Sequence, residues 1–193
     1  MHEAGKLRRV DRKDGVTMSE RVQSIDPIEA LVLETPSSYG VEASLPDGRK
    51  FVYCYTALTS ILVGGCVAVG RTGGATTAGR NPQATLPETD DNVAHVYGIA
   101  CKTTDAAGGV WVQVYGRCTF AKVDGTSAVA IGDSLKPVDG AQYLVQDAAV
   151  GNTKTAAAVA FAEEAEAVAY GSQTVTTGTP DNTIFITGQP ATL

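Results

Sequence analysis

The stretch from Val110 to Ala121 constrains the fold more than any other part of this sequence. Valine occupies every second position from Val110 to Val114, and Trp111, Gln113 and Tyr115 occupy the alternate positions. Successive side chains of a strand point to opposite faces of a sheet, so this period of two predicts a strand with two differently filled faces. The composition agrees, because it combines 21 glycines with only 6% aromatic residues. An all-β fold with many turns is therefore expected.

Further strand signals recur at short intervals along the chain. Pro46-Asp47-Gly48 is a strong turn between Tyr39–Leu45 and Arg49–Thr56, which predicts a hairpin. Residues 57–70 predict one strand or a pair of strands, with a bend at Gly64-Gly65. The other expected strands are 93–102, 110–121, the segments within 128–137 and 141–146, and 183–187, with a turn at 123–125. About eight to ten short strands indicate a small β-barrel or a sandwich.

Two segments do not fit this simple pattern. Residues 155–170 are rich in alanine, which favours a helix, yet Val159 and Phe161 alternate with alanines as in a strand. A strand is the preferred prediction, because local choices usually agree with the surrounding fold. Residues 71–92 predict a loop of unusual length, which either serves a function or becomes ordered against a partner.

The chain is expected to consist of an N-terminal arm, residues 1–37, and a body, residues 38–193, that forms the β-barrel domain with the long loop 71–92, and charge is distributed unevenly between its two ends. Residues 1–21 hold six Lys or Arg against four acids, whereas residues 22–193 hold nine against 17. An acidic body repels phosphates, so the folded part is not expected to bind nucleic acid. The basic start could contact an acidic protein surface, and the alternative is a solvated tail.

The four cysteines are Cys54, Cys66, Cys101 and Cys118, and none forms a CxxC pair. With only two histidines in the chain, a zinc site is not expected. Small buried thiols are the preferred interpretation, although three disulfide pairings remain open. The charged N-terminus lacks an apolar stretch, and the longest apolar run, Ile61–Val69, is too short to span a membrane. Synthesis in a reducing cytoplasm is therefore expected.

Nucleophilic and phosphate-binding motifs are weak. His95 lies in a strand-like run, where a structural role is preferred over that of a general base. Gly74–Asn81 has glycines at P-loop spacing, but Arg80 stands where lysine is needed and Asn81 where Ser or Thr would hold Mg²⁺. A flexible loop is the preferred interpretation of this segment.

Acidic residues cluster in two places, and each cluster has a chemical alternative. Glu163, Glu164 and Glu166 could act as a carboxylate pair of a glycosidase, but a solvated strand edge is preferred. Glu88, Asp90 and Asp91 lack the spacing of a calcium loop. The sequence therefore predicts a protein that is not an enzyme, with no catalytic residue, no cofactor and no metal ligand.

Several stretches in the second half of the chain carry a resemblance to a known family. They are His95–Ala100, Val110–Cys118, Ala128–Leu135 with its Gly132-Asp133 turn, Val159–Glu163 and Ile184–Ile186. In this order they resemble the head decoration proteins of tailed phages, which are also called cement or head-stabilising proteins. The resemblance covers roughly the last half of the chain, and about 90 residues precede it. Those preceding residues could form an added β-element, a swapped arm, or both.

The resemblance implies a small, tulip-like β-barrel that assembles as a homotrimer. Such trimers sit at three-fold and local three-fold axes on the outer surface of an icosahedral capsid. There they bind the major capsid protein and stabilise the shell against the pressure of packed DNA. The expected location is therefore the virion surface, with no nucleic-acid or membrane partner.

Contacts with the capsid or a neighbouring subunit are expected at a small set of arm residues and aromatic residues. These are Leu7, Arg8, Arg9, Arg12, Leu31, Leu33, Trp111 and Tyr115. For the two aromatic residues, the core of the same chain is an equally good location. The alternative functions are a phage tail or baseplate module, a carbohydrate-binding β-module that uses an exposed aromatic platform, or an enzyme that uses the glutamates near residue 164.

Overall fold

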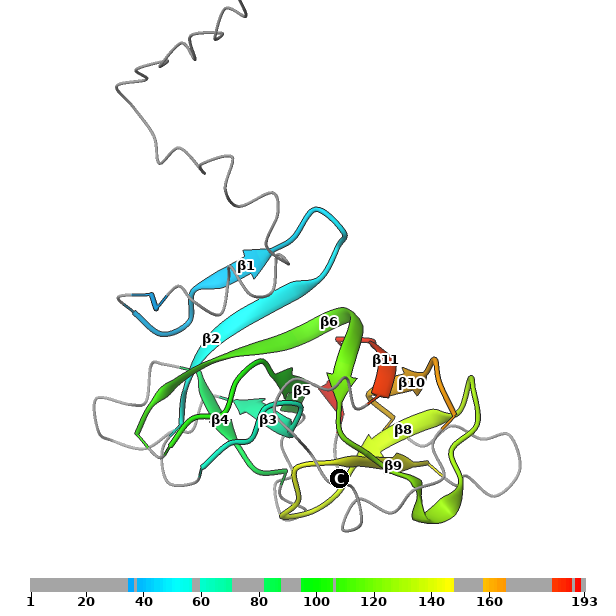
Figure 1. Cartoon of the computed structure of the whole chain (residues 1–193). Coiled ribbons are helices and arrows are strands. Elements are labelled where there is room, and N and C mark those ends of the chain that lie inside the picture. The colour runs from blue at the N-terminus through cyan, green and yellow to red at the C-terminus, as the bar shows by residue number, and fades with distance from the viewer. Residues whose placement is uncertain are drawn as a thin grey trace, which may run out of the picture.

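Twelve β-strands and one short 3-10 helix, η3, run through the part of the chain that the structure describes (Figure 1). The structure is a computed structural model that describes residues 35–36, 38–56, 60–70, 82–87, 95–105, 107–147, 158–165, 182–188 and 190–191. The elements are β1 (Glu42–Ser44), β2 (Lys50–Thr56), β3 (Cys66–Gly70), β4 (Gln83–Thr85), β5 (His95–Ala100), β6 (Gly109–Ala121), β7 (Val123–Asp124), η3 (Gly125–Ser127), β8 (Ser134–Pro137), β9 (Leu144–Gln146), β10 (Ala160–Ala162), β11 (Asn182–Ile186) and β12 (Pro190–Ala191). The prediction of an all-β fold built on a small barrel is confirmed.

Five of these strands close into a barrel. The ring runs β2–β4–β3–β5–β6 and returns to β2, with β2 and β4 parallel and the other neighbours antiparallel. Every second residue of a barrel strand points inward, and the interior is filled by small apolar side chains such as Cys54, Val67, Val110 and Val112. Trp111 points to the opposite face, where it joins a separate cluster. The alternation predicted for residues 110–115 is therefore confirmed.

Strand β4 corrects the expectation of an uninterrupted loop over residues 71–92. Gln83 pairs with Tyr55 of β2 and also with Gly70 of β3, so β4 bridges these two strands and completes the ring. The expectation was wrong at this point because the three residues of β4, which lie between Pro82 and Pro87, are too few to show a period. The other described residues of this segment, at 82 and 86–87, have no regular structure.

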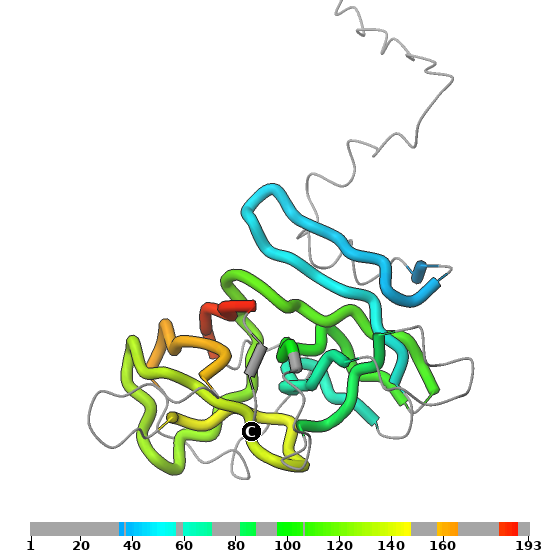
Figure 2. Tube along the Cα trace, turned by 180° about the vertical axis from the view of Figure 1, so that it is seen from behind, coloured from blue at the N-terminus to red at the C-terminus, as the bar shows by residue number. Residues whose placement is uncertain are grey.

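Strand β6 belongs to both halves of the molecule. It bends at Gly116, whose φ is +93°, and continues into a second sheet with the order β6–β11–β10–β8–β9–β7. The views from both sides show this sheet beside the barrel (Figures 1 and 2). Tyr97 and Ile99 of the barrel's outer face pack against Leu135, Ile184 and other residues of the second sheet. Burial of this shared cluster holds the two halves together.

The hairpin predicted around Pro46–Gly48 is formed by β1 and β2. Gly48 adopts a φ of +91°, and the backbone N–H and Nε of Arg49 both donate to the Asp47 carboxylate, at 3.1 and 2.7 Å. Figures 1 and 2 show that the hairpin projects from one end of the barrel. β1 pairs only with β2 among the described strands, so it forms one edge of the sheet.

Other local predictions have mixed outcomes. The bend at Gly64-Gly65 is present, with the N–H of Gly65 donating to the carbonyl of Leu62 at 3.0 Å. Within residues 155–170, Ala160–Ala162 forms strand β10, as preferred over a helix. The turn expected at 123–125 is instead the short strand β7 followed by η3, in which the N–H of Thr126 donates to the carboxylate of Asp124 at 3.2 Å. Residues 1–34 lie outside the described residues.

Candidate interaction surface

Three aromatic side chains lie in a row on one face of adjacent strands, and we call this row the aromatic strip. Its members are Tyr115 of β6, Phe185 of β11 and Phe161 of β10. Phe185 stands opposite Phe161 in the ladder, and Phe185 also pairs with Arg117, two residues after Tyr115. Cross-strand neighbours share a face of a sheet, so the three rings face the same side. Tyr115 and Phe185 pack edge to face, with ring centroids 5.6 Å apart and an interplanar angle of 78°.

The surroundings hold Tyr115 in place while leaving its ring accessible. Lys50, its register partner on β2, places Nζ 5.5 Å from the ring centroid, which is a favourable cation–π geometry. Gly188 lies behind the ring, where a Cβ would stand 3.2 Å from Cδ2 of Tyr115. The Tyr115 side chain is nevertheless 37% exposed. A fixed, partly exposed tyrosine loses little conformational entropy when it binds a partner.

Charged groups of both signs border the aromatic strip. Nε of Arg117 lies 2.6 Å from Oε2 of Glu163, and both side chains are exposed to solvent. Such a surface pair contributes little to stability, so its main effect is to present a fixed pattern of charge. Glu163, one of the three clustered glutamates, is thus engaged with an arginine. Glu164 is exposed, and Glu166 lies outside the described residues.

The structure separates the two aromatic residues that were expected to make contacts. Tyr115 is at the surface, in the aromatic strip. Trp111 is only 2% exposed and packs on Tyr53, with ring centroids 5.2 Å apart. It therefore occupies the core of its own chain, which was the second of its two expected locations. The expected arm contacts, Leu7, Arg8, Arg9, Arg12, Leu31 and Leu33, all lie outside the described residues.

Phe161, Phe185 and Lys50 are parts of this surface that the sequence did not reveal. Phe185 lies in the strand-like run Thr-Ile-Phe-Ile-Thr, which predicted a strand but not the identity of its neighbours. The pairing of β6 with β11 and of β11 with β10 brings together residues separated by up to 70 positions in the sequence. Which of these distant strands become neighbours depends on the tertiary fold, and the short-range pattern of each strand does not show it.

The residues considered for catalysis, metal binding or phosphate binding either have structural positions or lie outside the described residues. His95 begins β5 and pairs with Ala191. All four cysteines are buried and free, and burial raises the pKa of Cys54, Cys66 and Cys118 to about 12. Among the described residues, no group of three or more His, Cys, Asp or Glu is placed to hold a metal ion. The segment Gly74–Asn81 and the acids at 88, 90 and 91 are not described.

Within the same ranges, no helix is long and apolar enough to cross a membrane. A comparison with protein-family models finds no match to this chain, and a comparison with curated protein sequences finds none either.

Proposed function

We propose that this chain is a structural protein of a tailed-phage virion that decorates the outer surface of the icosahedral capsid. In this proposal it binds the major capsid protein as a homotrimer at three-fold and local three-fold axes and stabilises the shell. The stretches that resemble head decoration proteins supply residues of β5, β6, β8, β10 and β11, which are five of the strands of the body. The resemblance therefore extends over the part of the molecule that carries the aromatic strip.

The observation that carries the proposal is the aromatic strip and its charged border. Tyrosine, phenylalanine and arginine are enriched in protein interfaces, and here they lie on a rigid sheet rather than on a loop. A trimer would present three such surfaces at once. Multivalent attachment gives strong overall binding even where each single contact is weak, which suits a protein that must cover a whole shell.

The alternative of a carbohydrate-binding module receives less support. Such a module needs an exposed aromatic platform, and Trp111, one of the two side chains considered for it, is buried. Tyr115 remains exposed, but its ring packs edge-on against Phe185 rather than beside a second parallel ring. The alternative of a tail or baseplate module predicts a different copy number per particle. A measurement of the copy number therefore distinguishes it from the capsid proposal.

The experiment is quantitative mass spectrometry of purified virions, with the amount of this chain expressed relative to the major capsid protein. A ratio near one to one is expected, because trimers at all three-fold positions match the capsid subunits in number. A few copies per particle would assign the chain to the tail or a fibre. Its absence from virions would remove the proposal altogether.

A further inference from the structure

The mouth of the barrel next to the β1–β2 hairpin contains a pocket of about 520 Å³. It opens where β2 changes partner, since β1 pairs with residues Lys50–Val52 and β4 pairs with Tyr55 and Thr56. The two neighbouring strands diverge at this point and leave the end of the barrel interior uncovered. A volume of this size accommodates one or two side chains of a peptide.

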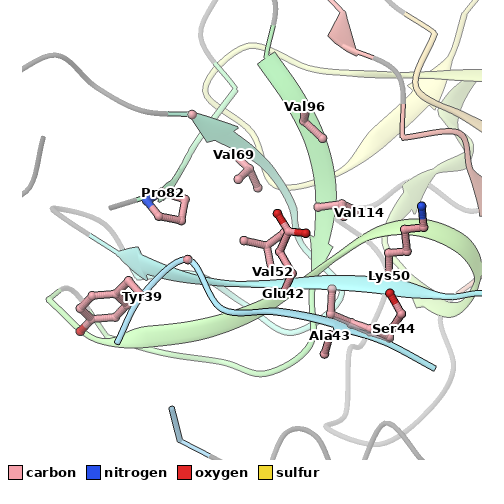
Figure 3. A pocket seen from close by; sticks show the side chains of 13 residues that line it. Tyr39, Glu42, Ala43, Ser44, Lys50, Val52, Val69, Pro82, Val96 and Val114 are labelled. Carbon is pink, nitrogen blue, oxygen red and sulfur yellow. The ribbon is translucent and has the colours of Figure 1, made fainter. Parts of the chain in front are cut away.

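The floor of the pocket is aliphatic and its wall carries one carboxylate. Four valines, one each from β2, β3, β5 and β6, form the floor: Val52, Val69, Val96 and Val114. Figure 3 shows the Glu42 side chain pointing from β1 toward these valines. Glu42 is solvent-exposed and forms no ion pair with any of the described residues. Lys50 also lines the pocket, but its ammonium lies over the ring of Tyr115.

The chemistry of the pocket selects a particular kind of occupant. An aliphatic side chain would fill the valine floor, and a neighbouring cation would lie beside Glu42. The N-terminal segment of this chain has this pattern at Lys6-Leu7-Arg8-Arg9-Val10. Residues 1–21 carry six basic groups against four acids, whereas the rest of the chain is acidic, so the two parts attract each other.

Chain connectivity places the same segment within reach of the pocket. Tyr39 and Gly40 line the pocket themselves, so the N-terminal residues join the body directly at its rim. Leu7 is 32 residues before Tyr39, and an extended chain of that length spans up to about 100 Å. A tether of this kind gives an effective concentration on the order of millimolar, which allows even a weak contact to form within one molecule.

We propose that in the free protein the segment Lys6–Val10 docks in the barrel-mouth pocket of its own chain, with Leu7 on the valine floor and the guanidinium groups of Arg8 and Arg9 beside Glu42. The segment would then be held against the body until a capsid or a neighbouring subunit competes for it. The inference concerns the free protein, so the test of this docking does not depend on whether the protein binds a capsid.

The test uses the full-length chain with a spin label on a cysteine introduced by Gly5→Cys. The four native cysteines are buried, so the new thiol is labelled selectively. Paramagnetic broadening of the methyl signals of Val52, Val69, Val96 and Val114 is expected, whereas Val159, in the core of the second sheet, should stay sharp. Uniform broadening, or none, would overturn the proposal.

Charge reversal supplies the specificity control. Glu42→Lys should abolish the broadening, and adding Arg8→Glu with Arg9→Glu in that background should restore it. Glu164→Lys, an equal charge change in the exposed bend after β10, should leave the broadening unchanged. Broadening that survives Glu42→Lys would contradict the assigned contact, as would loss of broadening in the Glu164→Lys protein.

A mixed sample decides whether the contact is made within one chain. Isotope-labelled chains without a spin label are mixed with unlabelled chains that carry it. The valine signals should then remain sharp at dilute protein concentration. Broadening as strong as in the single-chain sample would assign the pocket to the segment of another copy and overturn the intramolecular proposal. A Leu7→Ser protein, expected to lose the broadening, tests the apolar contact without altering the body.

Discussion

The side-chain amide of Gln113 donates a hydrogen bond to the main-chain carbonyl of Arg117, four residues further along β6, at 2.9 Å. The same Nε2 also lies 3.3 Å from the carbonyl of Tyr115. Gln113 is completely buried and sits at the register shift between β2 and β6, just before the bend at Gly116. Its amide therefore supplies hydrogen bonds where β6 leaves the barrel ladder and enters the second sheet.

Gln113→Leu should destabilise the protein by about 1–3 kcal/mol, because leucine keeps the approximate volume but leaves the two part-buried carbonyls without this donor. The free energy of unfolding is measured by urea denaturation. Thr119→Val, an exposed change on the same strand, should shift stability by no more than about 0.5 kcal/mol. Equal stability of the Gln113→Leu protein and the unchanged protein would show that the bend does not depend on this amide.

Gly98→Ala should be more damaging than Gly132→Ala. A Cβ at Gly98 would lie 2.5 Å from the carbonyl oxygen of Gln113 and 2.6 Å from Cγ1 of Val112, so β5 and β6 must separate. We expect a loss of about 3 kcal/mol or more. At Gly132 nothing lies within 4 Å, and only the φ of +88° opposes a side chain, which costs about 1–2 kcal/mol. Thermal and urea unfolding of the two variants compare these values directly, and the reverse order would mean that the barrel can widen at this point.

The buried thiols predict how stability depends on alkaline pH. Burial raises the pKa of Cys66 from an ordinary value of 9.0 to about 12, so folding favours the neutral thiol. This contribution is fully present below pH 9 and is lost as the pH rises toward 12, at roughly 1 kcal/mol per pH unit for each thiol. Urea denaturation at pH values from 8 to 10.5 should show the decline.

Cys66→Ala provides the matched comparison for this decline. Its unfolding free energy should fall less steeply with pH, because one titrating group has been removed. An unchanged slope would mean that other groups cause the loss of stability. At pH 8, a thiol reagent should modify the native protein slowly and the urea-unfolded protein at all four cysteines.

Local signals in the sequence were sufficient to predict the fold class, but they did not predict how the barrel closes. The alternation of Val110–Val114 and the turn at Pro46–Gly48 are short-range features, and both correspond to strands of the structure. β4 could not be predicted from the sequence, because a strand of three residues is too short to show an alternation of apolar and polar side chains. Its position between β2 and β3 depends on pairing with residues distant in sequence.

The interaction surface could be anticipated only in part, for the same reason. The pattern placed Trp111 and Tyr115 on one face of a strand, yet Trp111 is buried and Tyr115 is exposed. Trp111 lies in the cluster with Phe51 and Tyr53, whereas Tyr115 lies outside that cluster and directly before the bend at Gly116. A two-residue period describes a straight strand and does not show which part of it another layer will cover.

Tyr115→Ala should weaken attachment to capsids that have been stripped of this protein, if the proposed function is correct. Loss of a central interface aromatic costs about 2 kcal/mol or more per contact, which corresponds to roughly 30-fold in affinity. Tyr115→Phe should retain most of the binding, because the edge-to-face contact with Phe185 needs only the ring. Ile131→Ala removes a side chain that is 73% exposed on a turn after η3, and it serves as the control for loss of surface apolar area.

Binding is measured by co-sedimentation of each variant with capsids, and urea denaturation verifies that each variant is folded. Attachment of the Tyr115→Ala protein at the level of the unchanged protein would exclude the aromatic strip as the capsid contact. A comparable loss in the Ile131→Ala protein would place the contact at the turn between η3 and β8. Weakened binding by Tyr115→Ala alone, with Tyr115→Phe intact, is the result expected from the geometry of Tyr115, Phe185 and Lys50.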